Sequence, residues 1–295
     1  MSESNYAAII ERNRRPLQPI VTDVAPRLRH FHGLQAVLFD VYGTLLISAS
    51  GDIGADAGDH RIVALEETCR SLQVQLACPA AEMIRQLEAA ISAAHAKARS
   101  AGIEYPEVDI VEVWQSVLTD AVNDDTSVID LRSFALEYEV RANPVWPMPG
   151  AASTLDQLRD RGLVLGIVSN AQFFTPLLFR PLLGKSVTTF GFAPQLLYFS
   201  YEHRQAKPGN YLYLRAKGQL ESLGVSADQV LYVGNDMLND VTAAASVGFR
   251  TALFAGDQRS LRWRERDERV SDVQPDVVVT ELSQLLECLA APLDG

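Results

Sequence analysis

The sequence has little cysteine, and the cysteines that it has follow no pattern. Only Cys69, Cys78 and Cys288 occur among 295 residues, so the chain contains no CxxC pair and no regular ligand spacing. An odd and scattered set of this size indicates neither a disulfide framework nor a cysteine-based metal site. It is typical of a protein from a reducing compartment.

The sequence also lacks an excess of basic residues and any long apolar run. Its 26 lysines and arginines are outnumbered by 37 aspartates and glutamates, which gives a formal net charge of −11. A protein that binds the phosphate backbone of nucleic acid usually has the opposite balance. The first residues carry acid rather than the apolar segment of a signal peptide, and no later run is long enough to cross a bilayer. We therefore expect a cytoplasmic protein that binds neither nucleic acid nor membrane. Nothing in the sequence specifies an oligomeric state.

Short apolar stretches alternate with helical patterns over the second half of the chain. With 47% hydrophobic and 21% charged residues, the chain has an ordinary globular composition. The apolar stretches are apolar throughout, which is typical of a parallel sheet covered by helices on both faces. The sequence predicts strands at residues 36–39, 163–168, 196–199, 229–233, 251–254 and 276–279.

A long helical stretch separates the first predicted strand from the others. Its apolar residues recur at helical spacing, and helices are predicted at residues 62–76, 80–101, 106–122 and 128–141. We expect an α/β fold in which a Rossmann-like parallel sheet carries an inserted all-helical cap domain. The predicted units are an N-terminal extension at 1–34, a core at 35–46 and 146–295, and a cap at 47–145. Within the extension, residues 20–29 are compatible with a short docked helix.

Polar residues follow several predicted strands at the point where each strand ends. Asp40 follows the first strand, Ser169 and Asn170 follow the second, and Asp236 follows the fourth. The carboxyl ends of parallel strands meet at one edge of the sheet, which is where ligands bind in such folds. We expect Lys207, in a loop before a helix, to lie at the same edge. An aspartate there can attack a substrate and form an intermediate that water hydrolyses, while the lysine offsets negative charge.

The same edge holds candidate ligands for magnesium and for a substrate. Magnesium prefers a few carboxylates together with water and substrate oxygens. Hydroxyl groups and backbone amides near the nucleophile are suited to bind the transferred group. The candidates are Asp40, Ser169 and Lys207 for catalysis, Thr44 and Asn170 for substrate binding, and Asp40, Tyr42, Asp236 and Asp240 for the metal.

Four segments in this order resemble the haloacid dehalogenase (HAD) superfamily of hydrolases. They are Phe39-Asp40-Val41-Tyr42-Gly43-Thr44-Leu45, Ser169-Asn170, Lys207-Pro208 and Gly234-Asn235-Asp236-Met237-Leu238-Asn239-Asp240. The resemblance covers residues 36–280, and the helical insert resembles the cap that the family places after its first motif. It implies a magnesium-dependent hydrolase that acts through an aspartyl-enzyme intermediate on a small molecule, with a phosphate monoester as the first candidate substrate.

Two positions depart from the phosphatase pattern of that superfamily. Its phosphatases carry a second aspartate two residues after the nucleophile as general acid and base, and here that residue is Tyr42. A tyrosine does not readily replace a carboxylate whose pKa is near neutrality. Asn235 stands where the family more often has a metal-binding aspartate, so either Asn235 or Asp236 faces the metal.

These departures leave three interpretations of the function. The first is a phosphatase, and the second is a 2-haloacid dehalogenase, whose branch of the superfamily the Asp-x-Tyr-Gly-Thr form resembles. The third is a catalytically weak protein that keeps the fold for binding or interaction. An arginine-rich segment at 259–269 is interleaved with acidic residues, so we expect it to be solvated and internally salt-bridged.

Overall fold

A six-stranded parallel sheet forms the centre of the molecule. The computed structural model describes residues 3–49, 57–121 and 129–289, and within them the strand order is β5-β4-β1-β6-β7-β8. The strands are β1 (Ala36–Phe39), β4 (Val164–Ser169), β5 (Phe192–Phe199), β6 (Val230–Gly234), β7 (Arg250–Phe254) and β8 (Val277–Val279). The prediction of an α/β fold with a Rossmann-like sheet is confirmed.

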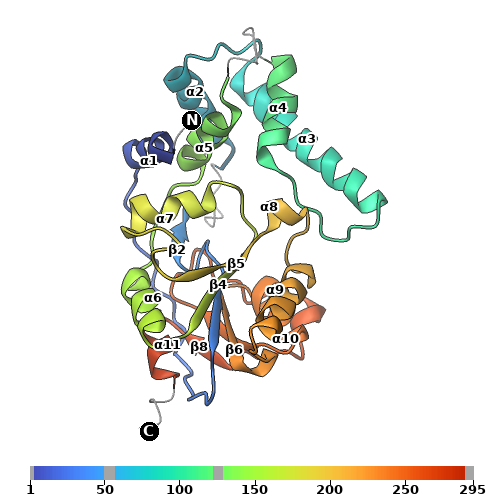
Figure 1. Cartoon of the computed structure of the whole chain (residues 1–295). Coiled ribbons are helices and arrows are strands. Elements are labelled where there is room, and N and C mark those ends of the chain that lie inside the picture. Colours follow the sequence, from blue (N-terminus) through green and yellow to red (C-terminus); the bar gives the residue numbers. More distant parts are fainter. Residues whose placement is uncertain (1–2, 50–56, 122–128, 290–295) are drawn as a thin grey trace.

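Helices cover both faces of this sheet. Side chains alternate along a strand, so Val37 and Phe39 of β1 pack in one apolar cluster, and Ala36 and Leu38 pack in another. Figure 1 shows α6 and α11 beside one face of the sheet and α9 and α10 beside the other. These helices are α6 (Ala151–Asp160), α11 (Gln284–Glu287), α9 (Tyr211–Ser222) and α10 (Ala243–Ser246). Because both faces are covered, each strand is apolar throughout.

The four described helices between β2 and β3 in sequence pack together at one end of the sheet (Figure 1). They are α2 (Ala57–Leu72), α3 (Ala80–Ser100), α4 (Ile110–Ala121) and α5 (Leu131–Ala142). The chain enters them through β2 (Leu46–Ser48) and leaves through β3 (Val145–Pro147), and these two strands pair antiparallel. No helix in the described ranges combines the length and apolarity needed to span a membrane.

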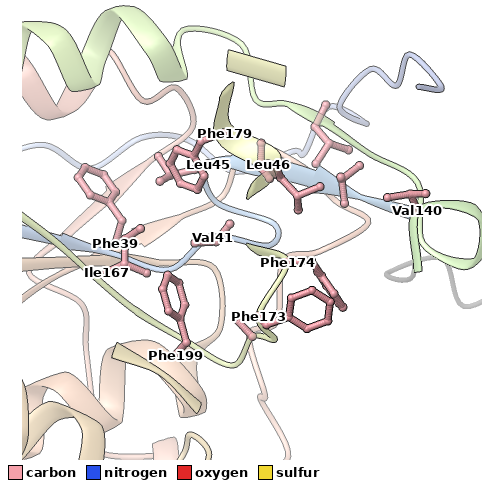
Figure 2. Packing of buried hydrophobic residues seen from close by; sticks show 14 of the residues in the cluster. Phe39, Val41, Leu45, Leu46, Val140, Ile167, Phe173, Phe174, Phe179 and Phe199 are labelled. Atoms are coloured by element: carbon pink, nitrogen blue, oxygen red, sulfur yellow. The ribbon is translucent and has the colours of Figure 1, made fainter. Parts of the chain in front are cut away.

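The loop that follows β1 is fixed by packing between the sheet and these helices. The largest apolar cluster contains Val41, Leu45 and Leu46, which are almost fully buried. It also contains Val140 of α5 and, from another helix, Phe179. Figure 2 shows these side chains together. Buried side chains of this kind hold a backbone in one conformation, because interiors are close-packed. The residues of the first motif therefore sit on a rigid support.

Residues 3–34 pack against the described part of the remaining chain. Helix α1 (Glu3–Arg12) contacts α5 and α7 (Thr175–Leu183), and Arg12 forms an ion pair with the buried Glu137. Residues 20–29 contain no helix, although their sequence is compatible with a short one. Their backbone instead bonds to the core, where Arg27 N donates to the carbonyl of Val278 over 2.8 Å. Pairing with β8 satisfies these backbone groups more directly than a helix would.

Candidate active site

Asp40 lies at the carboxyl edge of the sheet, at the end of its central strand. Strand β1 pairs with β4 on one side and β6 on the other. Ser169 ends β4, and the Asn235–Asp240 segment follows β6. The polar residues after three adjacent strands are thus brought to one place, which is where open α/β sheets bind ligands. The Asp40 side chain is largely buried there, with 6% of the residue exposed.

One carboxylate oxygen of Asp40 accepts two hydrogen bonds. Ser169 Oγ donates to Oδ1 over 2.8 Å, and Lys207 Nζ donates to the same oxygen over 2.7 Å. Within the described part of the chain, Oδ2 has no hydrogen-bond partner. The carboxylate is therefore fixed in orientation by one oxygen, and the other oxygen is available to attack a substrate.

Lys207 joins Asp40 to a second acid of the site. Its ammonium group also donates to Asp240 Oδ1 over 2.6 Å and to the Tyr232 hydroxyl over 3.2 Å, so all three N–H groups have acceptors. Burial lowers the pKa of the ammonium, but Asp240 and Asp40 outweigh it and hold that pKa above its ordinary value. Burial raises the pKa of Asp240 to about 6, although Lys207 opposes this. One cation thus serves two buried carboxylates.

The two predicted substrate-binding residues hold loops in place. Asn170 Oδ1 accepts from the backbone N–H of Lys207 over 2.7 Å, and its Nδ2 donates to the Lys207 carbonyl over 3.1 Å. The fully buried Thr44 donates from Oγ1 to Asn235 Oδ1 over 3.2 Å. Asn170 therefore fixes the backbone of the lysine, and Thr44 links the first motif to the fourth. Their contact with a substrate stays a prediction.

The fourth motif forms a short π-helix, η4 (Met237–Thr242), whose N-cap is Asp236. The Asp236 carboxylate accepts from two backbone N–H groups of this helix and forms a two-pronged ion pair with Arg264, at 2.6 Å for the closest contact. Asp240 Oδ2 accepts from the backbone N–H of Asp236 over 2.9 Å. A Cβ at Gly234 would lie 2.3 Å from Asp240 Cγ, so only glycine admits this carboxylate above the end of β6.

The four predicted metal ligands do not come together as one set. The Tyr42 hydroxyl lies 2.9 Å from Thr175 Oγ1, and burial raises its pKa, so the phenol stays protonated. The Asp236 and Asp240 carboxylates are engaged by the cationic side chains described above. Among the residues that the structure describes, no group of three or more histidine, cysteine, aspartate or glutamate side chains has a metal-binding arrangement. A four-ligand magnesium site built on Asp40 and these three residues does not fit.

Asn235 fits the role of a metal ligand better than Asp236. Its Nδ2 donates to the carbonyl of Ser260 over 2.6 Å, which fixes the amide so that Oδ1 faces Thr44 in the loop after Asp40. Magnesium in proteins is usually bound through one or two carboxylates together with water and substrate oxygens. Asp40 and Asn235 meet that pattern, and their small charge predicts weak binding until a substrate adds its own oxygens.

The non-helical segment before α4 is hydrogen-bonded to the loop that carries Lys207. The backbone N–H of Ala206 donates to the carbonyl of Tyr105 over 2.8 Å, and that of Glu107 donates to the carbonyl of Arg204 over 3.1 Å. Arg204 also forms an ion pair with Glu112 of α4 at 2.7 Å. The helices between β2 and β3 therefore contact the site directly.

Residues 34–248 match the family model of haloacid dehalogenase-like hydrolases. The chain belongs to this family. The match contains all four motifs and most of the sheet, so the resemblance to the HAD superfamily is confirmed, and the protein is a hydrolase of this family.

The curated proteins that this HAD-like hydrolase matches are phosphatases, and the solved structures with a similar fold include dehalogenases. A ribulose-1,5-bisphosphate 5-phosphatase from Halopiger xanaduensis is 26% identical over 143 residues, which cover 48% of this chain and 56% of the relative. The chain spans between 30% and 56% of the length of the curated relatives that it matches. A 2-haloacid dehalogenase from Pseudomonas syringae pv. tomato has a similar fold, with a TM-score of 0.57, 21% identity, and coverage of 86% and 97% of the two chains. A HAD phosphatase from Thermococcus onnurineus also has a similar fold. Its TM-score is 0.51 and its identity is 19%, and the match covers 86% of this chain and 97% of the phosphatase.

Two residues of the HAD-like site were not predicted from the sequence. Tyr232 lies in an apolar strand, so its pattern indicates a core residue, yet its hydroxyl group binds Lys207 and donates to the Val168 carbonyl over 2.7 Å. Arg264 belongs to the arginine-rich segment that was expected to be internally salt-bridged. Arg269 in that segment does pair locally, with Asp267, but Arg264 reaches the fourth motif instead.

We expect Asn235→Asp to tighten magnesium binding by this HAD-like hydrolase. A carboxylate replaces a neutral carbonyl that contacts Thr44 in the loop after Asp40, so the affinity for Mg²⁺ should rise about tenfold or more, which is about 1.4 kcal/mol. Isothermal titration calorimetry with MgCl₂ measures this directly. The control is Asn239→Asp, which adds the same charge four residues away. An equal gain in both variants would show that general electrostatics, rather than ligation at position 235, is responsible.

We expect Gly43→Ala to destabilise the site loop. Gly43 has φ +82°, and a Cβ there would lie 2.6 Å from Ser260 Cβ and 2.9 Å from Asn235 Nδ2. Backbone strain and crowding together should lower the free energy of unfolding by about 2–4 kcal/mol. Gly33→Ala is the matched control, because Gly33 has φ +75° with nothing within 4 Å of its Cβ position. Urea unfolding of Gly33→Ala should show a loss in free energy of unfolding of only about 1–2 kcal/mol, from backbone strain alone. Equal losses in the two variants would rule out crowding at Gly43.

Proposed function

We propose that this HAD-like hydrolase cleaves phosphate monoesters of small molecules, with Asp40 as the nucleophile. The observation that carries the proposal is the state of the Asp40 carboxylate. One oxygen is held by Ser169 and Lys207, and the other has no partner among the described residues. The similarity to a curated phosphatase supports phosphorus as the centre that is attacked.

The reaction follows from the contacts of these residues. Asp40 Oδ2 attacks phosphorus, the ester oxygen leaves, and an aspartyl phosphate forms, which water then hydrolyses. Lys207 offsets the negative charge that the nucleophile and the phosphoryl group bring together. Ser169 keeps the carboxylate oriented and lies where its hydroxyl group can contact the transferred group. Asn170 positions Lys207 through its backbone.

A magnesium ion completes the charge balance of this site. Asp40 and Asp240 are opposed by the single cation Lys207, and Asp236 is already neutralised by Arg264. A phosphate dianion entering such a site needs more positive charge than the chain supplies. Asp40 and Asn235 are the residues that would hold Mg²⁺, which would stabilise charge on the phosphate oxygens.

The helices α2–α5 act in this proposal as a cap domain, spanning residues 47–145 between the two parts of the core. Their attachment at residues 105–112 to the Lys207 loop supports a role in enclosing the substrate and excluding water. An enclosed site suits a small molecule rather than a nucleic acid or a membrane surface. A cytoplasmic location stays the prediction made from the sequence.

The experiment that tests the function is a panel of phosphate monoesters assayed in the presence of MgCl₂ and in the presence of EDTA. We expect phosphate release that requires the metal and is lost in Asp40→Asn. Release that persists in Asp40→Asn would remove Asp40 from the mechanism. Release that is unaffected by EDTA would remove magnesium from it.

Hydrolytic dehalogenation is the second candidate, and Tyr42 favours it. This residue stands where the superfamily's phosphatases have their second aspartate, and its hydroxyl group is bound to Thr175. Halide release from 2-haloacids without metal, together with inactivity on every phosphate ester, would support this candidate. Inactivity on both panels would favour a binding protein.

A further inference from the structure

The N-terminal extension touches both the helices α2–α5 and the core. It lies outside the stretch that matches the family model, which begins at residue 34. Helix α1 packs against α5 and also against α7, so one short helix contacts the inserted helices and the sheet domain at the same time. Figure 1 shows α1 on the side of the molecule away from α8 (Ser200–His203), next to which residues 105–107 attach. The inserted helices are therefore fastened to the core on two sides.

One face of α1 is apolar and buried. Tyr6, Ile9 and Ile10 recur at the spacing of a single helical face, and each is 8% exposed or less. They belong to the largest apolar cluster, together with Phe134 of α5 and Leu178 of α7. Because the two neighbouring helices belong to different parts of the fold, those parts cannot separate here without exposing apolar surface to water.

Phe173 is the residue at which the three parts meet. It belongs to the loop after β4, the same loop that begins with Asn170. The Tyr6 ring of α1 packs edge-on against it with 6.4 Å between the ring centroids. The guanidinium carbon of Arg132 of α5 lies 4.9 Å from the centroid of the same ring. The extension, the inserted helices and a loop of the candidate active site are thus in direct contact, through geometries that are favourable for aromatic and cationic groups.

Arg12 binds α5 through a carboxylate that has a second partner. It forms an ion pair with Glu137, whose side chain is fully buried, whereas 47% of the Arg12 side chain is exposed. Arg141, one turn further along α5, pairs with the same carboxylate. When α1 separates from α5, Glu137 keeps Arg141, so no buried charge is left without a partner. This attachment is therefore one that can break and form again.

The other end of the extension is bound to the core. The backbone N–H of Ile20 donates to Asp257 Oδ1 over 2.9 Å, and Thr22 Oγ1 donates to the carbonyl of Ala255 over 2.6 Å. Further along, the extension pairs with β8. These contacts keep the extension with the sheet, so any movement of α2–α5 away from the sheet has to break the contacts of α1 with α5.

We propose that residues 3–31 form a strap that holds α2–α5 closed over the edge of the sheet that carries Asp40, and that α1 must release α5 before these helices can move. The inference rests on the proposed role of α2–α5 as a cap and adds the device that controls their movement. The paired strands β2 and β3 are the only connections between the cap and the core along the chain, so they are the hinge. The strap thus sets how often the site opens to a substrate without touching the substrate itself.

Hydrogen–deuterium exchange followed residue by residue by NMR tests the strap. The reporters are three backbone N–H groups that donate across the contact between the cap and the core, at Glu107, Ile110 and Ala206. They exchange when the cap opens. We expect Tyr6→Ala to speed their exchange by about tenfold or more and Arg12→Gln by about threefold or more. Amides of β1 and β6 should keep their wild-type rates, which shows that the sheet stays folded.

The control is Arg29→Gln, which removes an arginine of the same extension that pairs with Asp276 of the core rather than with the cap. It should leave the reporters unchanged. Unchanged reporters in Tyr6→Ala and Arg12→Gln overturn the strap. It is also overturned by an equal acceleration in β1 and β6, which indicates general destabilisation, and by an acceleration of the reporters in Arg29→Gln.

The exchange measurement contains no substrate, so its result is independent of the phosphate-ester panel. Accelerated reporters in a protein that hydrolyses no phosphate ester would overturn the phosphatase function and retain the strap. Unchanged reporters in a protein that releases phosphate would overturn the strap and leave the phosphatase function intact.

Discussion

Asp40→Asn is expected to lower the rate of phosphate-ester hydrolysis by roughly 10⁴-fold or more while leaving the protein at least as stable as wild type. The amide keeps the shape of the carboxylate but is not a nucleophile, so no aspartyl intermediate forms. The measurement is phosphate release in single-turnover conditions, and mass spectrometry should find no phosphorylated enzyme. Asp228→Asn, at an exposed residue of a turn, is the control and should keep wild-type activity.

The stability part of this prediction follows from the charges of the site. Asp40 and Asp240 share one buried cation, and the field of Asp40 helps to raise the pKa of Asp240 to about 6. A carboxyl whose pKa is raised on folding stabilises the protein at low pH, and that contribution is lost as the pH rises through the folded-state value. Removing the charge of Asp40 lowers the pKa of Asp240, so less stability is lost between about pH 4 and 6.

Urea unfolding at pH 4.5 and pH 7 tests the stability of Asp40→Asn. We expect the variant to gain stability relative to wild type at pH 7 and to show little difference at pH 4.5. The gain in stability at pH 7 is expected because active sites keep like charges close together at a cost in stability, and Asp40→Asn removes one of those charges. A variant that is less stable than wild type by about 2 kcal/mol or more at pH 7 would show that the Asp40 carboxylate is a net stabilising group.

Lys207→Met is expected to remove activity and to destabilise the protein strongly. The ammonium group satisfies two buried carboxylates and the Tyr232 hydroxyl, and methionine offers none of these three donors. Leaving buried charges without a partner costs about 3–5 kcal/mol. The hydrolysis rate should fall by at least about 100-fold, because the charge near the phosphoryl group is no longer offset.

The effect of Lys207→Met should depend on pH in a defined direction. Lys207 lowers the pKa of Asp240 in the wild type, so its removal moves that pKa above about 6. At pH 5 the Asp240 carboxyl group of the variant takes up a proton and stability is regained, whereas at pH 8 the group stays charged. Urea unfolding at these two pH values should show the larger loss at pH 8. Lys185→Met is the control, because it removes a lysine from a partly exposed ion pair with Asp156. Its loss in free energy of unfolding should stay below about 1 kcal/mol at both pH values. A loss for Lys207→Met that does not change with pH would contradict the shared-cation arrangement.

Local patterns predicted most of the elements of this hydrolase. Apolar positions at helical spacing between a glycine and a strand predict a helix at residues 151–160, and α6 has these bounds. The same kind of pattern predicts a helix at 238–247, and the structure has a helix there that begins as a π-helix. Helix α7 was not predicted, since Pro176 and Pro181 within it are poor helix formers and its packing outweighs that preference.

The sequence by itself determined the parallel sheet, the order of its elements and the position of Asp40 at the end of a strand. These depend on apolar periodicity and on residues that are adjacent in the chain. Only the tertiary structure decided which polar groups meet. Arg264 neutralises Asp236 from 28 residues away, and Lys207 reaches Asp40 across 167 residues. Burial and charge pairing act through space, so the chemistry around Asp40 follows from the packed fold rather than from spacing along the chain.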